Sequence, residues 1–273
     1  MGLNSVNTNY GASIALQNLN TTNSSLQVSQ QRLSTGLKVS SAKDNAAVYA
    51  IAQNTRANVA GLDAVKSSLE RGQSAVDVAL SAGQSIADVL TQMKEKVLAA
   101  ADTSISTASR DALKDEFESL RDQITKISSN ASFDGMNLIK SGATDLVSIA
   151  NTDLSKITIA AQTLSLAGIG LTATSTFTTA TTASSLSALI DTAIEDVSTK
   201  LGKLGTGSTA MSRQSTFVGK LQDSLNNAIG NLVDADLASE SAKLQALQTK
   251  QQLGVQALSI ANQSTSSILS LFR

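Results

Sequence analysis

Residues 234–273 read DADLASESAKLQALQTKQQLGVQALSIANQSTSSILSLFR. The stretch contains no proline and only one glycine, so a continuous helix can run through it. Its apolar residues fit the inner positions of one heptad frame: Leu237, Leu244, Leu247, Leu258, Ala261, Ile268 and Phe272. Glu240, Gln251, Gly254 and Thr265 interrupt that frame. An apolar but discontinuous stripe predicts a helix that needs partners, because most helical stability comes from burying the apolar face.

A second weak heptad repeat lies near the other end of the chain. It is embedded in a segment rich in Asn, Ser, Thr and Gln, and its members are Ala12, Leu19, Leu26 and Leu33. One interpretation is that the C-terminal helix folds onto its own domain. Two weakly apolar helices at the two ends of one chain favour another, in which residues 1–34 and 234–273 pair with each other.

The segment after the first helix is predicted to be a short connection followed by a long helix. Gly36 provides a break within residues 35–43, and Ser40 or Ser41 offers an N-cap for the next helix. At about 1.5 Å per residue, a helix over residues 44–100 would approach roughly 80 Å, which is a rod. Its apolar stripe consists of Val48, Ala52, Val59, Leu62, Leu69, Val76, Leu80, Ala87, Leu90 and Val97. The pattern tolerates the glycines inside it, which are Gly61, Gly72 and Gly83.

A second rod helix is predicted after residues 101–106. Its inner positions follow an unbroken 4-3-4-3 spacing and form a rod seam of Leu113, Phe117, Leu120, Ile124 and Ile127. The other face is charged, which is typical of a solvated face or of a contact with another subunit. The short connection predicts that this helix folds back antiparallel on the first.

The middle of the chain changes character. Residues 145–149 and 156–159 alternate like half-buried strands. We therefore predict a small β-hairpin region at about residues 137–183. Residues 172–185, almost entirely Thr, Ser and Ala, are predicted to be an exposed loop or a ragged strand.

Helical spacing resumes near Leu186. Gly202, Gly205 and Gly207 interrupt it, and sequence rules alone would end the helix there. Residues 205–210 also match the loose dinucleotide fingerprint G-x-G-x-x-A, but that motif requires a preceding strand, and here it follows an amphipathic helix.

The composition argues against several classes of function. The 273 residues carry a net charge of −1, include no His, Cys, Pro or Trp, and are 3% aromatic. The commonest transition-metal ligands and the usual nucleophile–base pairs are therefore missing. The charge does not point to nucleic acid, and aromatic residues are too few to stack along single strands. No window approaches the roughly 18–20 apolar residues of a membrane span. We predict no enzymatic activity, no cofactor, no metal, no nucleic acid partner and no membrane insertion.

Short motifs in three places carry a resemblance to a known family. The N-terminal ones are Val6-Asn7-Thr8-Asn9 and the segment Gln31–Ala47, which reads QRLSTGLKVSSAKDNAA. The C-terminal ones are Ala261-Asn262-Gln263 and the final Leu-Ser-Leu-Phe-Arg. These motifs closely resemble the signatures of bacterial flagellins, and Phe133-Asp134-Gly135 resembles the family's Phe-Asn-Gly turn. They occur in the family's order, so the resemblance covers essentially the whole chain.

The resemblance implies a structural subunit that polymerises into the flagellar filament for swimming motility. Residues 44–233 would form the rod domain, with one continuous helix through residues 202–210. The chain looks too short for the large variable outer domains of many flagellins. The paired terminal helices would line the inner tube of the filament, with an assembly core of Leu19, Leu26, Leu33, Leu244, Leu247, Leu258, Ile268 and Phe272.

The resemblance also implies partners and a location. The partners are further copies of the chain, alone or mixed with other flagellins, an export chaperone on the C-terminal segment, and the filament cap and hook-junction proteins. No signal peptide is visible, since the first basic side chain is Arg32, and this alone would predict a cytoplasmic protein. The family instead leaves the cell uncleaved through the flagellar type III export channel, which implies an extracellular filament.

Two further properties of the family can be compared with this sequence. Many flagellins are sensed by an animal Toll-like receptor through a helix segment reading Leu-Gln-Arg-Val-Arg-Glu-Leu. Residues 90–96 here read LTQMKEK, so Gln92 replaces an arginine and Lys96 replaces the final leucine. Exposed Thr and Ser residues carry O-linked sugars in some flagellins, and candidates here are Thr176, Thr178, Thr179, Thr181, Thr182 and Ser184.

Two alternatives to a filament subunit remain open at this stage. A hook–filament junction protein of the same superfamily shares the terminal helices. A cytoplasmic signalling coiled coil is also rich in Ala, Ser and Gln, although it would usually have longer heptad runs and no β region between its helical arms.

Overall fold

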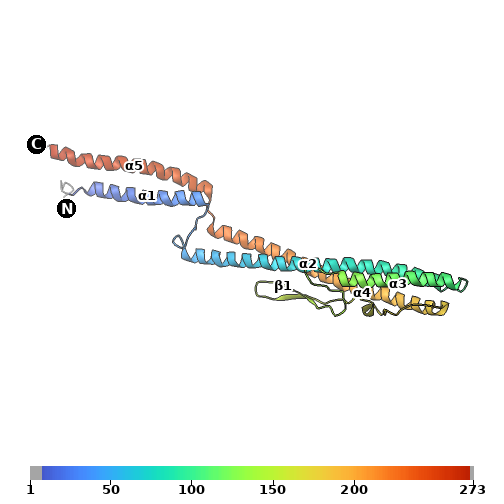
Figure 1. The fold of residues 1–273 in the computed structure, drawn as a ribbon. Helices are drawn as coiled ribbons and strands as arrows, with labels where there is room; N and C mark the ends of the chain where they lie inside the picture. Colours follow the sequence, from blue (N-terminus) through green and yellow to red (C-terminus); the bar gives the residue numbers. More distant parts are fainter. Residues whose placement is uncertain (1–7, 271–273) are drawn as a thin grey trace. The chain divides into compact units, whose positions relative to one another are not determined.

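The computed structural model describes residues 8–270, and their side chains as far as residue 263. Five long helices dominate this part of the chain (Figure 1). In order, the elements are α1 (Tyr10–Thr35), α2 (Ala46–Ala100), α3 (Thr107–Asn130), β1 (Leu146–Ile149), β2 (Lys156–Ile159), a 3-10 turn η1 (Ala167–Ile169), α4 (Ala180–Val233) and α5 (Leu237–Ser270). The predicted fold class, long antiparallel helices with a small β-hairpin, is confirmed.

The chain divides into two compact units. The terminal unit comprises residues 1–57 and 224–273, and the rod unit comprises residues 58–223. The long helices α2 and α4 contribute to both, since α2 spans residue 57 and α4 spans residue 223.

In the rod unit, α4 runs antiparallel to α2. Gln73 Nε2 donates to Ser208 Oγ over 2.9 Å, while Lys94 Nζ lies 2.5 Å from a carboxylate oxygen of Asp191. Residue numbers therefore rise along α2 as they fall along α4. The helix α3 lies alongside α2, where Glu116 pairs with Lys96 (Figure 1).

The observed core of α2 follows two columns of residues spaced seven apart. Leu62, Leu69, Val76, Leu90 and Val97 of the predicted stripe are buried, which confirms the first column. In the second column the prediction is wrong by one residue, because Ala79 and Ile86 are fully buried where Leu80 and Ala87 were expected. A straight helix drifts relative to a strict heptad, so a single stripe read from the sequence does not follow the buried side along the whole helix.

Two glycines lie in these columns and permit close approach between elements. A Cβ atom at Gly83 would lie 2.4 Å from Leu201 Cδ2 and 3.0 Å from Leu164 Cδ1. At Gly72 it would lie 2.3 Å from Met211 Cε. A side chain at either position would clash with a neighbouring element. The observed packing therefore depends on these two glycines, which the sequence pattern alone indicated only as tolerated.

The two strands form an antiparallel hairpin in the register Leu146↔Ile159, Val147↔Thr158, Ser148↔Ile157 and Ile149↔Lys156. Leu146 and Ser148 are buried and Val147 is exposed, as expected for a hairpin with one face covered. Ser68 Oγ on α2 accepts from Ile149 N over 3.2 Å, and Gln214 Nε2 on α4 donates to Ala150 O over 2.8 Å. Both long helices therefore bind the hairpin.

Helix α4 continues through Gly202, Gly205 and Gly207, as the family resemblance implied. It also begins earlier than expected, inside the Thr/Ser-rich stretch. Thr182 N donates to Thr179 Oγ1 and Thr179 N donates to Thr182 Oγ1, over 3.2 and 3.0 Å. This reciprocal capping satisfies amides at the helix end, so the second half of the predicted loop is helical.

In the terminal unit, the connection between α1 and α2 pairs with the link between α4 and α5. Lys38 N donates to Val233 O over 2.7 Å, and Ala235 N donates to Gly36 O over 2.9 Å. Gly36 adopts φ +70°, which glycine reaches without strain. The predicted cap of α2 is wrong, because Asn45 Oδ1 accepts from Val48 N, while the hydroxyls of Ser40 and Ser41 donate to Asp44.

Many Ser and Thr hydroxyls on the exposed helix faces bond within their own helix. Each donates to the carbonyl oxygen four residues earlier, a geometry that satisfies the hydroxyl without a partner from another element. Examples are Thr22, Ser74, Thr91, Thr192 and Thr209.

Candidate functional site

The candidate functional site is the terminal pair, formed by α1 and α5 lying side by side (Figure 1). Apart from Ser241, the buried and half-buried residues of α5 follow an unbroken 4-3-4-3 spacing and are Glu240, Leu244, Leu247, Gln251, Gly254, Leu258 and Ala261. This set contains the heptad positions between 240 and 261 that the sequence indicated, including its interruptions. We call this set the terminal seam.

The interruptions of the heptad are the points at which α5 meets specific groups of α1. Ser29 Oγ donates to Glu240 Oε1 over 2.6 Å, and Gln251 Nε2 donates to Asn23 Oδ1 over 2.8 Å. At Gly254, an added Cβ would lie 3.2 Å from Cδ1 of a leucine on α1. Numbers rise on one helix as they fall on the other, so the two helices are antiparallel and these contacts set their register.

The most buried contact of the terminal pair is polar. Ser29 is fully buried and Glu240 is 9% exposed. The Ser29 hydroxyl, with smaller contributions from Lys243 and Arg32, holds the pKa of the Glu240 carboxyl below its ordinary value, although burial acts in the opposite direction. The ionised carboxylate is therefore the form that the folded pair favours.

The predicted assembly-core residues occupy two kinds of environment. Five are half-buried between the two helices, and Leu33 is exposed at 38%. The five are Leu19, Leu26, Leu244, Leu247 and Leu258. The side chain of Ile268 and the whole of Phe272 lie outside the described residues. No apolar side chain of α1 or α5 within residues 8–263 is fully buried, so the pair covers its apolar surface incompletely.

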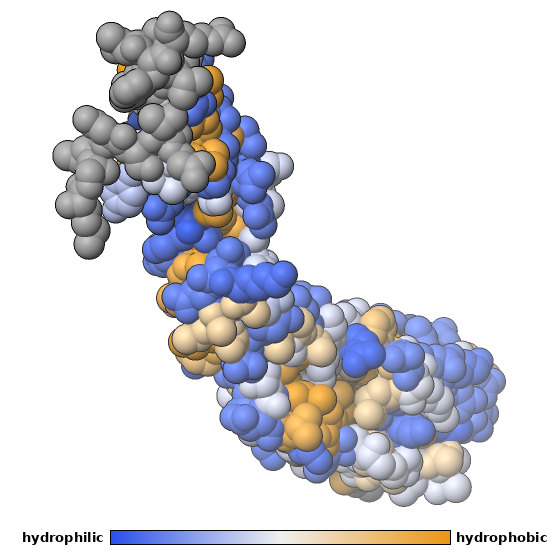
Figure 2. All heavy atoms as spheres, turned by 90° about the vertical axis from the view of Figure 1, so that its left-hand side faces the viewer, coloured by the Kyte–Doolittle hydropathy of each residue, from blue (hydrophilic) through white to orange (hydrophobic). Residues whose placement is uncertain are grey.

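Further apolar side chains lie on the outer faces of the pair. Tyr10, Ile14 and Val28 are 73%, 44% and 42% exposed and share one side of α1. Leu253 and Ile260, seven residues apart on α5, are 58% and 68% exposed. In Figure 2, hydrophobic atoms lie among hydrophilic ones on the terminal helices. The pair therefore presents apolar surface that the described residues do not cover.

The rod seam contrasts with the terminal seam. Phe117 and Ile124 are fully buried, and the Phe117 ring packs edge-on against Phe177 with centroids 5.6 Å apart. Leu113, Leu120 and Ile127 are half-buried. The largest apolar groups of α3 are therefore covered within one chain.

The two receptor-motif positions both lie on α2. Gln92 is exposed. Lys96 Nζ lies 2.5 Å from Glu116 Oε2 on α3, and this hydrogen bond raises the pKa of Lys96. The ammonium at this position is thus held by a carboxylate of its own chain.

The six hydroxyls singled out in the sequence differ in how they are used. Thr176 Oγ1 donates to Glu118 over 2.8 Å, and the hydroxyls of Thr179 and Thr182 lie 3.0 Å apart in the cap of α4. Within the described chain, the remaining hydroxyls have no hydrogen-bond partner, and they belong to Thr178, Thr181 and Ser184.

Two general features of the described residues bear on function. No cluster of three or more Asp and Glu residues in this part of the chain is arranged to hold a metal ion. None of its helices has a stretch long and apolar enough to cross a bilayer.

Comparison with known proteins gives matches over most of the sequence. Residues 6–144 match the family model described as the bacterial flagellin N-terminal helical region, and residues 187–272 match the bacterial flagellin C-terminal helical region. Flagellin FljK and Flagellin FljM of Caulobacter vibrioides are each 62% identical over 273 residues, covering 100% of both chains. A flagellin of Brucella melitensis is 37% identical, covering 98% of this chain and 99% of that protein.

The contact between Ser29 and Glu240 predicts an acid-sensitive terminal pair. Because the folded pKa of Glu240 lies below its ordinary value of 4.5, its contribution is fully present above that value and is lost as the pH falls through the lowered one. We expect amide-exchange protection of residues 20–35, corrected for intrinsic rates, to fall in this acid range.

The Glu240→Gln variant is the matched control, since it keeps a hydrogen-bond acceptor and cannot ionise. Other carboxylates titrate in both proteins, so the difference between them isolates Glu240. Equal loss of protection in the wild type and in Glu240→Gln would contradict the prediction.

Proposed function

This chain belongs to the bacterial flagellin family and is a structural subunit of the flagellar filament, and on that premise we propose that its terminal pair is the self-assembly core. The observation that carries the proposal is the uncovered apolar surface of α1 and α5, including Leu253 and Ile260. Contiguous exposed apolar surface is typical of a protein–protein interface. In a helical polymer, copies of the same pair are available to cover it.

The physical basis of the proposal is a difference between the two units. The rod unit buries large side chains such as Phe117, Ile124 and Leu90 within one chain. The terminal pair has a seam whose most buried contact is a hydroxyl and a carboxylate. Two helices that bury so little apolar area gain little on pairing, and each further copy adds the burial that they lack.

The same proposal extends to partners and location. An export chaperone would cover the outer apolar side of α5 before secretion, and the filament cap and hook-junction proteins would meet the ends of the polymer. We further propose that the chain is exported and functions outside the cell, as filament subunits of this family do. A purely structural role, without catalysis, accords with a sequence that contains neither His nor Cys.

Other flagellar and signalling proteins explain the observations less well. The full-length relatives are named flagellin, which favours a filament subunit over a hook–filament junction protein. The hairpin bound between α2 and α4 has no place in an uninterrupted signalling coiled coil.

The assembly role of the outer face of α5 can be tested at Ile260, which is 68% exposed. Ile260→Asp should leave the fold of the monomer unchanged, because the side chain packs little against its own chain. It should raise the free monomer concentration in equilibrium with filaments by about tenfold or more, since losing one buried Ile costs about 1.5–3 kcal/mol. Sedimentation of polymerised protein, with circular dichroism of the monomer, measures both effects.

Two further variants serve as controls. Ile260→Val keeps most of the apolar area and should polymerise nearly as the wild type does. Ile124→Asp places a charge in the buried core and should unfold the rod unit, by about 3 kcal/mol or more. Normal filaments from Ile260→Asp would refute the assembly role of the outer face of α5.

We also propose that the Toll-like receptor that senses many flagellins recognises this chain weakly. Gln92 lacks the charge and the forked donors of arginine, and Lys96 is already paired with Glu116. A receptor reporter assay with purified monomer should give little response. The double change Gln92→Arg with Lys96→Leu should recover part of it. A wild-type response as potent as that of a motif-matching flagellin would exclude this proposal.

The exposed hydroxyls near the start of α4 are proposed sites of O-linked glycosylation. Thr178, Thr181 and Ser184 are the best placed, because the hydroxyls of Thr176, Thr179 and Thr182 are engaged in hydrogen bonds. Protein from native filaments should then have an intact mass above the 28.1 kDa of the sequence, and replacing the three free hydroxyl residues by Ala should remove the excess. A native mass equal to the sequence mass rules the modification out.

A further inference from the structure

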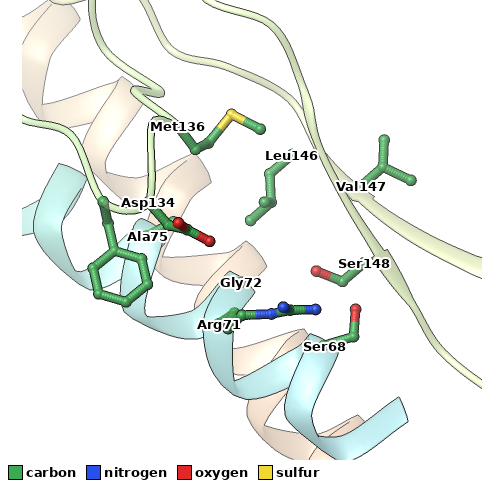
Figure 3. A pocket seen from close by; sticks show the side chains of 10 residues that line it. Ser68, Arg71, Gly72, Ala75, Asp134, Met136, Leu146, Val147 and Ser148 are labelled. Carbon is green, nitrogen blue, oxygen red and sulfur yellow. The ribbon is translucent and has the colours of Figure 1, made fainter. Parts of the chain in front are cut away.

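A small hollow lies in the rod unit, between α2, the turn that follows α3, and strand β1 (Figure 3). Its volume is about 160 Å³. Binding sites for small molecules commonly measure about 300–1,000 Å³, so this hollow suits a single side chain better than a cofactor or a metabolite.

Three polar groups converge on one side of the hollow. In Figure 3 the guanidinium of Arg71 extends towards the hydroxyls of Ser68 and Ser148. Ser68 Oγ accepts a hydrogen bond from Ile149 N, so its own proton remains available to a further acceptor. All three groups can therefore donate towards the same point.

Two of these groups lack a partner in the described part of the chain. Ser148 is only 2% exposed, and its hydroxyl forms no hydrogen bond there. Arg71 forms no ion pair with any carboxylate of residues 8–263. The Ser148 hydroxyl and the Arg71 guanidinium are therefore both available to an acceptor that enters the hollow.

The other side of the hollow is apolar except for Asp134. Leu146, Met136 and Ala75 line it, and Asp134 lies beside Ala75, away from the guanidinium of Arg71 (Figure 3). The cavity thus pairs a donor-rich end with an apolar wall. Such an arrangement matches a group with a carboxylate head and a short hydrocarbon stem, because a guanidinium fork and hydroxyls bind carboxylate oxygens well.

We infer that the Arg71 pocket receives the carboxylate side chain of an Asp or Glu from a second copy of this chain. The inference rests on the proposed self-assembly and adds to it a contact between the rod units of neighbouring copies. The chain carries 22 Asp and Glu residues, while none of those described reaches Arg71 from within its own chain. The pocket would therefore be filled only in the polymer, and it would contribute specificity to the contact between rods.

Ser148→Ala gives the sharpest test. The change removes a hydroxyl that bonds to no described residue of its own chain, so the thermal stability of the monomer should be almost unchanged. If the hydroxyl binds an incoming carboxylate, the free monomer concentration in equilibrium with filaments should rise about threefold or more. A purely structural role for Ser148 would leave assembly unaffected.

The second variant is Arg71→Gln, which should raise the free monomer concentration by about tenfold or more, with Arg71→Lys intermediate because an ammonium lacks the planar fork. Lys66→Gln, with the same change of charge on another side of α2, should have less than about a twofold effect. Amide exchange of the monomer verifies that each rod unit remains folded.

The outcomes separate this inference from the proposed function. Wild-type protein that forms no filaments would refute self-assembly, and this inference with it. If Ser148→Ala and Arg71→Gln both leave the free monomer concentration at the wild-type value, the inferred carboxylate contact in the pocket is wrong, while self-assembly stands. Micromolar binding of inorganic phosphate to the wild-type monomer, lost in Arg71→Gln while assembly is unchanged, would also overturn the inferred contact, because the hollow would then hold a free anion.

Discussion

The antiparallel register between α1 and α5 is the constraint on which the proposed function depends. It is fixed at one end of the pair and at points along its length by contacts that a shifted register would break. At one end the backbone of Gly36 and Lys38 pairs with that around Val233. Further along, Ser29 meets Glu240 and Asn23 meets Gln251. A shift of one heptad would leave a buried carboxylate without its donor, so polar contacts provide the specificity that a weak apolar stripe cannot.

The two units differ in how completely they bury their apolar side chains. In the rod unit, glycines allow helices and hairpin to approach closely, as at Gly83 beneath Leu201, and large apolar groups such as Phe117 and Leu90 are covered completely. In the terminal pair, the apolar groups are only partly covered and the buried contact is polar. The first arrangement buries such groups within one chain. The second leaves apolar surface that further copies would cover in the proposed assembly, which suits a reversible polymer.

The sequence predicted the types of the elements well, because long proline-free apolar repeats determine helices and short alternating runs determine strands. The sequence was a poorer guide to which residues face each other. Glu240, Gln251 and Gly254 read as faults of a heptad, since their meaning depends on Ser29, Asn23 and Leu19, more than two hundred residues away. Local signals also competed. Several residues before α2 can cap a helix, and only the structure shows that Asn45 does so. No sequence pattern pointed to the pocket, which combines residues of α2, β1 and a turn.

The hydroxyls that bond back to their own helices have a consequence for how such a surface is dehydrated. When two subunits meet, each polar group that loses water must find a new partner or leave a penalty behind. A Thr such as Thr91 or Thr209 already has its partner, the carbonyl four residues earlier, and keeps it after burial. With charged residues at only 16% of the chain, the surface stays wettable in the free subunit and yet releases its water at low cost. Solubility before assembly and close packing after it are thus properties of the same hydroxyl-rich helix faces.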